Sequence, residues 1–209
     1  MYSSDVKIKP KRKSDLRFGT KVIASRDCIY VDPAIKAQTK KLADLAYRLM
    51  PHFRKELDLP KNVTVRLAKT KKRANNGVWY EWDKTATIDP RRPINDILNT
   101  LSHELIHAKQ YHTGQLSKGS RATNFHNIWE GEVVKSRGAT YKSYRNLPWE
   151  KEAFGRSSEV LFKTIIRAYK AGDLKLEDVA KYVGWGYICR NESKIADEIQ
   201  IASNGKKVV

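Results

Sequence analysis

The segment "PINDILNTLSHELIHAKQYH", residues 93–112, constrains the fold more than any other part of the chain. Its apolar residues recur at three- and four-residue steps, which predicts one long amphipathic helix. Pro93 suits a first helical turn, and Asp96 suits the positive end of the helix dipole. We therefore expect a domain built around this helix, with its histidines opposite an apolar stripe that consists of Ile94, Ile97, Leu98, Leu101, Leu105 and Ala108.

The polar face of this helix carries the chemistry. His103 and His107 are four residues apart, so they share one face and can bind the same metal ion. Glu104 points about a quarter-turn away, where its carboxylate can move a proton from a metal-activated water to a leaving amine. The spacing predicts a Zn²⁺ site with Glu104 as general base, and the alternative is a solvated helix face carrying two ordinary histidines.

A catalytic zinc ion needs a third protein ligand, and the nearest histidines do not supply it. His112 lies about a quarter-turn off the metal face. Gln110 and Thr113 stand where the extended metzincin pattern requires glycine and histidine. His52 precedes the whole unit and is expected at the surface. The third ligand therefore comes from farther along the chain.

Three residues remain candidates for that third ligand. His126 lies in "ATNFHNIWEG", a segment that could fold back onto the helix. Glu150 and Glu152 lie in "LPWEKEAF", at the start of a second predicted helix, from which a carboxylate can reach the first helix as in known His₂Glu sites. The two glutamates are the better candidates; alternatively, both only stabilise the dipole of their own helix.

Short strands precede the motif helix. Alternating apolar residues predict a half-buried strand over residues 62–70, and two further short strands are expected at 78–82 and 85–88. Asn76-Gly77 between the first two is the strongest hairpin signal in the chain. These strands predict an α+β fold class with a small antiparallel sheet packed on the motif helix.

Helices account for most of the remaining chain. Helical periodicity covers residues 33–57, with a kink or an end expected at Pro51. It returns over residues 147–172, and again near 176–183. Residues 113–146 are polar and glycine-dotted without sustained periodicity, so we expect a long functional loop with short pieces of structure.

The division into domains follows from these patterns. Residues 1–21 are rich in Lys and Arg and are interrupted by Pro10 and Gly19, which indicates a flexible basic arm. Residues 22–172 form the expected catalytic domain, and 173–209 form a C-terminal helical extension and tail.

The segments "TLSHELIHAKQYHTGQL", "IWEG" and "YRNLPWEKEA" together resemble the small HExxH metallopeptidase-like proteins common in bacteriophage genomes, relatives of the SprT-like and minigluzincin zincins. The resemblance covers roughly residues 63–168 and implies a zincin-like fold that hydrolyses peptide bonds with zinc. In gluzincin-like relatives the third ligand is a Glu followed three residues later by a small residue. Glu150 with Ala153 fits that pattern and Glu152 does not, whereas SprT-like enzymes use a third histidine, for which His126 is available.

The resemblance also implies roles for residues near the metal. An edge strand should bind extended substrate backbone by strand addition, and Val78, Trp79 and Tyr80 are its candidates. A tyrosine often stabilises the oxyanion in zincins, and Tyr141 and Tyr144 are both available. The expected substrate is a protein or peptide.

The charge balance favours polyanionic surroundings, because 41 Lys and Arg against 23 Asp and Glu give a net charge of +18. Basic residues beside the aromatic "WYEW" are candidates for nucleic-acid contact; they are Lys69, Lys71, Lys72 and Arg73. A protease acting on DNA-bound or virion proteins fits this balance. So does a phage structural or genome-associated protein that retains a zincin fold without needing catalysis, and a solvated charged surface is the plainest alternative.

Cysteine usage and hydropathy bear on the compartment. Cys28 and Cys189 are far apart and neither lies in a CxxC pair, which argues against a zinc ribbon and a secreted disulfide scaffold. No apolar stretch approaches the length of a membrane span or follows the basic start as a signal peptide would. We therefore expect a cytoplasmic protein, of the host cell or the virion, that does not contact a membrane.

Overall fold

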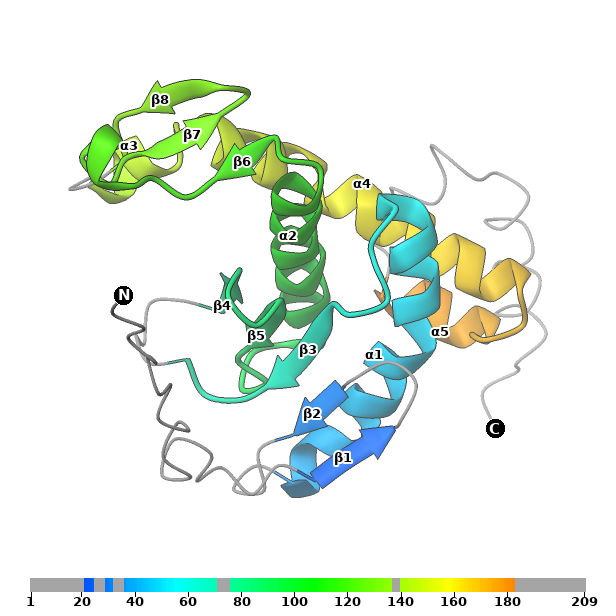
Figure 1. The fold of residues 1–209 in the computed structure, drawn as a ribbon. Helices are drawn as coiled ribbons and strands as arrows, with labels where there is room; N and C mark the ends of the chain where they lie inside the picture. The colour runs from blue at the N-terminus through cyan, green and yellow to red at the C-terminus, as the bar shows by residue number, and fades with distance from the viewer. Residues whose placement is uncertain (1–20, 25–28, 32–35, 71–75, 137–139, 183–209) are drawn as a thin grey trace, which may run out of the picture.

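The computed structural model describes residues 21–24, 29–31, 36–70, 76–136 and 140–182 (Figure 1). The fold is α+β, as predicted, with two small sheets arranged around long helices. Residues 1–20 of the basic arm, both cysteines and Lys71, Lys72 and Arg73 lie outside the described residues, so the predictions made for them are not addressed by the structure. Lys21, the last residue assigned to the arm, lies in a strand.

The main sheet has five strands in the order β1-β2-β3-β5-β4. Their bounds are β1 Lys21–Ala24, β2 Ile29–Val31, β3 Thr64–Leu67, β4 Gly77–Tyr80 and β5 Thr85–Ile88. The predicted antiparallel arrangement is wrong for the centre of this sheet, because β2, β3 and β5 run parallel and only β1 and β4 are antiparallel to their neighbours. The reason is the crossover: helix α1, Lys36–Leu57, connects β2 to β3, and only parallel strands need such a connection.

The hairpin predicted at Asn76-Gly77 is also wrong, since β3 and β4 do not pair and β5 lies between them. The hairpin forms one step later, between β4 and β5, where Lys84 adopts a left-handed φ of 51°. Every residue of β5 is buried, whereas every residue of β4 is only half-buried. The strand that is buried on every residue, β5, therefore lies inside the sheet, and β4 lies at its edge. Burial of β5 outweighs the preference of Asn76-Gly77 for a hairpin turn.

Three long helices form the core with this sheet; the first two pack on the sheet, and the third packs against both of them. They are α1, α2 (Ile94–His112) and α4 (Pro148–Lys170), and the short α5 (Leu176–Tyr182) packs against α4. Helix α1 continues through Pro51, on its exposed face, so the end that was one of the two predicted outcomes there is wrong. The helices α2 and α4 pack closely where Ala153 is fully buried and the Ser102 hydroxyl donates to the Ser157 carbonyl at 2.7 Å.

Residues after α4 join the same core. Leu174 and Val179 are buried in the cluster that contains the α1 and α4 side chains. His52, predicted at the surface, is only 8% exposed, and its Nε2 lies 2.7 Å from the Asp173 carboxylate. The turn between α4 and α5 is thereby tied to α1, which a sequence pattern within either segment does not reveal.

The predicted long loop contains a second sheet. Its strands are β6 (Leu116–Ser117), β7 (Asn127–Trp129) and β8 (Glu132–Val134), all antiparallel, with a 3₁₀ turn η3 at Arg121–Thr123 and a short helix α3 at Tyr141–Tyr144. We call residues 116–136 the small subdomain. It lies at the end of α2 where the helix stops, at the top of Figure 1. Leu116 of this subdomain forms a small buried cluster with Leu147 and Trp149 at the start of α4.

Candidate metal centre

Two helices bring three potential metal ligands together. His103 and His107 come from α2 and Glu150 from the first turn of α4. The His103 and His107 Nε2 atoms are 3.1 Å apart, and the Glu150 carboxylate oxygens lie 3.3 Å from the first and 3.4 Å from the second. Within the described part of the chain, these three residues form the group of His, Cys, Asp and Glu that could hold a metal ion.

The spacing of these donors fits a bound ion. Ligands about 2.0–2.1 Å from a tetrahedral zinc ion lie about 3.3 Å from one another, which is close to the three separations observed here. The Glu150 Oε2 atom is buried and has no hydrogen-bond partner among the described residues. A buried carboxylate oxygen without a partner is costly, and a cation between the three side chains would satisfy it.

Glu150 is held as an anion. Burial raises its pKa, but the neighbouring His103 and His107, together with the Tyr144 hydroxyl, outweigh burial and lower the pKa to about 2. Helix α4 begins with Pro148 at its first turn, so the carboxylate also lies at the positive end of the helix dipole. An ionised carboxylate is the form that binds a metal.

Gln110 determines which nitrogen of His107 faces the site. The Gln110 Nε2 group donates to the Trp149 carbonyl at 3.0 Å and to the Glu152 carboxylate at 2.9 Å, and both partners can only accept. The Gln110 Oε1 atom must therefore face His107, whose Nδ1 lies 2.8 Å away and must be the donor. In the neutral ring the lone pair of His107 is then on Nε2, directed toward His103 and Glu150, as a metal ligand requires.

Glu104 is buried beside these ligands. Burial raises the pKa of its carboxyl, and the Glu150 charge adds to this, while His107, His103 and the Trp79 backbone N–H oppose it. The net upward shift brings the pKa of the Glu104 carboxyl closer to neutral pH, where the group can both accept and release a proton. Burial lowers the pKa of His107, but the carboxylates of Glu150 and Glu104 outweigh burial, so the pKa of His107 is raised.

The edge strand β4 approaches Glu104 closely, and Gly77 permits this. A Cβ atom on Gly77 would lie 2.5 Å from Thr100 Cγ2 and 2.9 Å from the Glu104 carboxylate. The Trp79 backbone N–H donates to Glu104, so the backbone of Trp79 faces away from β5 and toward the site. The predicted edge strand of Val78, Trp79 and Tyr80 is therefore at a sheet edge and next to the predicted general base.

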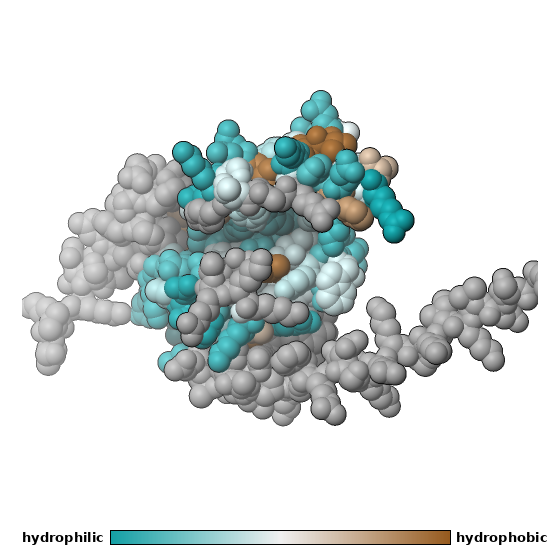
Figure 2. Space-filling model, turned by 90° about the vertical axis from the view of Figure 1, so that its left-hand side faces the viewer, coloured by the Kyte–Doolittle hydropathy of each residue, from teal (hydrophilic) through white to brown (hydrophobic). Residues whose placement is uncertain are grey.

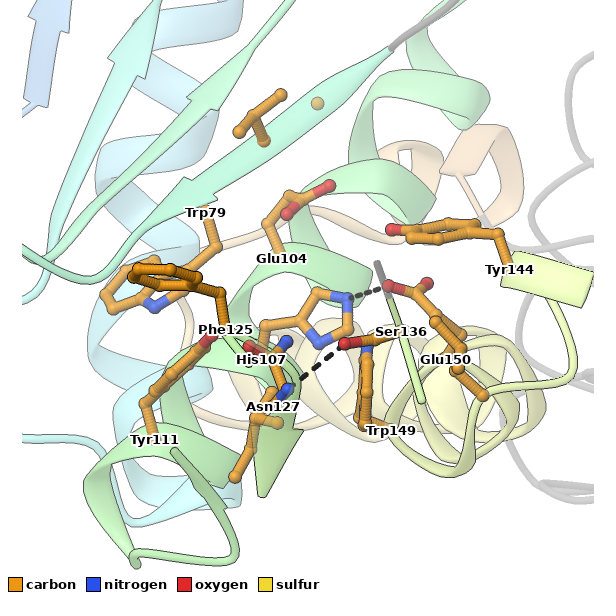
Figure 3. Close-up of a pocket in the computed structure, with 14 residues that line it drawn as sticks. Trp79, Glu104, His107, Tyr111, Phe125, Asn127, Ser136, Tyr144, Trp149 and Glu150 are labelled. Atoms are coloured by element: carbon orange, nitrogen blue, oxygen red, sulfur yellow. Dashed lines mark hydrogen bonds and ion pairs between the residues drawn. The ribbon is translucent and has the colours of Figure 1, made fainter. Parts of the chain in front are cut away.

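A pocket of about 380 Å³ opens between β4 and the small subdomain. Figure 2 shows it as a hollow that separates the upper part of the surface from the lower part. The pocket has two ends (Figure 3). The apolar end carries Trp79, Tyr111 and Phe125, the metal end carries Tyr144 and Glu150, and His107 lies between them. Glu104 also lies between the two ends, since the Trp79 backbone N–H donates to it. The rest of the lining consists of Gly77, Val78, Leu116, Asn127, Ser136, Leu147 and Trp149.

The pocket tyrosines are held protonated. Burial raises the pKa of Tyr111 to about 12, and the charges of Glu81 and Glu150 act in the same direction. Burial and the Glu150 charge also raise the pKa of Tyr144. Of the two tyrosines considered for oxyanion stabilisation, Tyr144 lines the pocket, and the side chain of Tyr141 at the start of α3 lies outside what the structure describes.

The alternative ligands lie elsewhere. Glu152 accepts from Gln110 and pairs with Arg156. The His126 Nδ1 atom accepts a hydrogen bond from the Ser136 backbone N–H at 3.2 Å, and His112 is exposed. Lys69 is exposed beyond the end of β3, and the other three basic candidates are outside the described residues.

Sequence reasoning missed several residues of the site. The position of Gln110, three residues after His107 on one helix, was a usable signal because such residues are neighbours. Gly77 had been interpreted only as part of a turn. Tyr111, Phe125 and Trp149 carried no signal, because their role in the pocket depends on how the small subdomain folds back over α2.

Comparison with known proteins does not assign this chain to a family. No family model and no solved structure matches the chain. A curated 3-deoxy-manno-octulosonate cytidylyltransferase of Sodalis glossinidius (strain morsitans) is 29% identical over 77 residues, which are 36% of this chain and 31% of that enzyme. The chain thus spans less than a third of that enzyme's length, and the likeness assigns it neither a family nor an activity. Among the described helices, none is both long and apolar enough to cross a membrane.

Proposed function

We propose that the chain is a zinc-dependent metallopeptidase with a zincin-like fold. The observation that carries this proposal is the triangle of His103, His107 and Glu150 donors, separated by 3.1–3.4 Å and containing a buried carboxylate oxygen without a hydrogen-bond partner. Two imidazoles and one carboxylate form a donor set that zinc prefers, and three protein ligands leave a coordination position open. A zinc ion there would supply a Lewis acid that lowers the pKa of a water molecule to about 7.

Glu104 serves as general base and then general acid. Its carboxylate accepts a proton from the water that attacks the peptide carbonyl carbon, and it delivers that proton to the nitrogen as the C–N bond breaks. The raised pKa of the buried carboxyl supports this double role, because a carboxyl with an ordinary pKa is a weak proton acceptor and seldom a proton donor near neutrality. Tyr144, protonated and in the pocket, can donate a hydrogen bond to the oxyanion.

Strand β4 is the proposed substrate-binding edge. In a strand, the N–H and C=O of one residue point to the same side, so the Trp79 carbonyl faces the pocket with its N–H. A substrate backbone aligned beside β4 can donate to this carbonyl. The bond to be cleaved would then lie near Glu104, which already contacts the same residue of β4.

Mutation of Glu104 and metal analysis together test the proposal. Wild-type protein should bind zinc in a one-to-one ratio and cleave an unfolded protein or a mixed peptide pool. The Glu104→Gln variant should keep the zinc and lose cleavage by about a hundredfold or more, as expected when a general base is removed. Absence of zinc in the wild type, or undiminished cleavage by Glu104→Gln, contradicts the proposal.

The substrates we propose are proteins associated with DNA or a virion. The net charge of +18 and the sequence resemblance to phage HExxH proteins support this class of substrate. The same charge favours a second candidate function, a genome-associated structural protein that binds nucleic acid and retains the zincin fold without catalysis. In that case Glu104→Gln leaves the biological role intact and DNA affinity falls steeply with salt, whereas absence of DNA binding at low salt excludes the candidate.

A further inference from the structure

Phe125 presents an unusual combination of exposure and position. Its side chain is 55% exposed, although it belongs to a large apolar residue. It lies in the wall of the pocket, on the same side as Trp79 and Tyr111 and away from Glu150 (Figure 3). Leaving a large apolar side chain in water is unfavourable, so a surface that covers it on binding would recover that free energy.

The backbone at Phe125 is also strained. Phe125 has a φ of 61° and the preceding Asn124 has a φ of 50°, so two consecutive residues other than glycine adopt the left-handed conformation. Asn tolerates that region, but a bulky aromatic residue rarely adopts it. Such conformations persist only where the surroundings enforce them, and they concentrate at ligand-binding positions.

The surrounding loop enforces this conformation. The Phe125 N–H donates to the Ser120 carbonyl at 2.7 Å, and the Thr123 hydroxyl donates to the His126 carbonyl at 2.9 Å. Gly119 packs so closely that a Cβ atom there would lie 1.9 Å from the His126 carbonyl oxygen. The loop between β6 and β7 is therefore internally fixed, and so is the backbone position from which the Phe125 side chain projects.

The apolar end of the pocket is lined by the aromatic rings of Trp79, Tyr111 and Phe125. The Glu150 carboxylate is at the metal end, and Glu104 lies between the two ends. We propose that the apolar end binds a large apolar side chain of the substrate polypeptide, next to the cleaved bond, and that Phe125 is the residue that determines this specificity. The inference rests on the proposed peptidase function, because it identifies the substrate class of that same site.

The chemistry of the lining explains the selection. A bulky apolar side chain covers the exposed ring of Phe125 and the neighbouring aromatic surfaces, whereas a small side chain leaves them hydrated. An acidic side chain meets repulsion from Glu104 and Glu150 nearby. Differences of a few methylene groups in an apolar pocket change kcat/KM by about 10- to 200-fold.

Cleavage of a mixed peptide pool by the zinc-loaded full chain, with products mapped by mass spectrometry, is the first test. We expect one position beside the cleaved bond to be dominated by large apolar residues. Phe125→Ala should lower kcat/KM for these peptides by about tenfold, while alanine at the same position is cleaved as before. Val133→Ala is the matched control, because Val133 is 56% exposed on the same subdomain but does not line the pocket.

Binding to the zinc-loaded Glu104→Gln variant is the second test, because it does not depend on turnover. A peptide with phenylalanine at the selected position, or a peptide hydroxamate carrying a benzyl side chain if no cleavage occurs, should bind at least about tenfold more tightly than its alanine counterpart. Addition of Phe125→Ala should remove that difference. If no peptide is cleaved but the phenylalanine peptide still binds more tightly than the alanine peptide, the peptidase activity is rejected and the apolar binding site is supported. Equal affinities for the two peptides, cleavage without a preference for apolar residues, or a Phe125→Ala variant with the wild-type preference would overturn the inference.

Discussion

The two ends of the pocket are built by different kinds of structure. The metal end lies on α2 and α4, two long helices whose buried faces belong to the main core. The apolar end takes its outer wall from the small subdomain, of which only Leu116 among the described residues is buried, in a cluster with Leu147 and Trp149 at the start of α4. The groups proposed for catalysis are therefore held by extensive packing, and the groups proposed for selectivity by a fixed loop on a small base. Substitutions at the first end should change whether a bond is cleaved, and those at the second end which bond is cleaved.

The largest effect is expected from Glu150→Ala, which removes one of the three donors. Zinc affinity should fall by more than the roughly 10- to 100-fold typical of residues that only support a ligand. Equilibrium competition with a chromogenic chelator measures the loss. Glu152→Ala, two residues along the same helix, is the matched control and should lose less; equal losses in both variants would refute the ligand assignment.

Gln110→Ala tests whether the metal end depends on more than its donors. The substitution removes the acceptor for His107 Nδ1–H and the link to α4, so zinc affinity should fall by about 10- to 100-fold with the three donors intact. The same chelator competition measures it. Gln115→Ala is the control, because the Gln115 side-chain amide donates to the exposed Glu130 carboxylate at 3.0 Å, away from the three donors. Unaltered affinity in Gln110→Ala would show that the amide does not orient the histidine.

A pair of glycine substitutions tests the apolar end. Gly119→Ala forces a Cβ atom against the His126 carbonyl, so it should destabilise the fold by about 1–3 kcal/mol and weaken the preference for bulky peptides while zinc affinity is kept. Gly155→Ala on α4 meets no atom within 4 Å and should stabilise the fold by about 0.5–1 kcal/mol. Thermal unfolding and zinc titration of both variants measure the contrast. Loss of zinc affinity in Gly119→Ala would mean that the two ends are not separable.

The smallest effect is expected from acid, at a site that belongs to neither end. Asp89, between β5 and α2, accepts from the Arg91 backbone N–H at 3.1 Å and from Arg91 Nε at 2.8 Å, and these bonds lower its pKa below the ordinary 3.8. Because the pKa of Asp89 is lower in the folded chain, its interaction with Arg91 stabilises the fold fully at pH values above the ordinary pKa. This stabilisation is lost as the pH falls through the lowered pKa.

Urea unfolding at several pH values measures this effect. Between about pH 5 and pH 3 the stability of the wild type should fall more steeply than that of Asp89→Asn. Asp44→Asn, on the exposed face of α1, is the control and should follow the wild type. Parallel pH profiles for the wild type and Asp89→Asn would contradict the assignment.

The difference between the two ends also explains how much could be predicted. The helices α2 and α4 were predicted because the apolar residues of an amphipathic helix recur every three to four residues along the sequence. The same periodicity placed His103, Glu104 and His107 on neighbouring faces. Glu150 was reached by its position at the start of the second helix, together with a family resemblance, and the structure places it beside both histidines.

The small subdomain was not predicted, for physical reasons. Its strands have two or three residues, which is too short for an alternating pattern to be recognised. Its loop depends on contacts such as that between Gly119 and His126, which no local pattern records. The parallel centre of the main sheet was missed for a similar reason, because strand order depends on which strand is buried and not on which turn is strongest.

The position of the metal ligands in the chain has a consequence for folding. His107 and Glu150 lie on either side of the segment that contains β6, β7, β8 and α3, so an ion bound to both closes this segment into a loop. Closing a loop lowers the entropy of every state in which α2 and α4 separate and release the segment. Zinc should therefore slow the backbone hydrogen exchange of the small subdomain, although none of its residues binds the ion, and a chain that has not acquired zinc would present Phe125 on a more mobile wall.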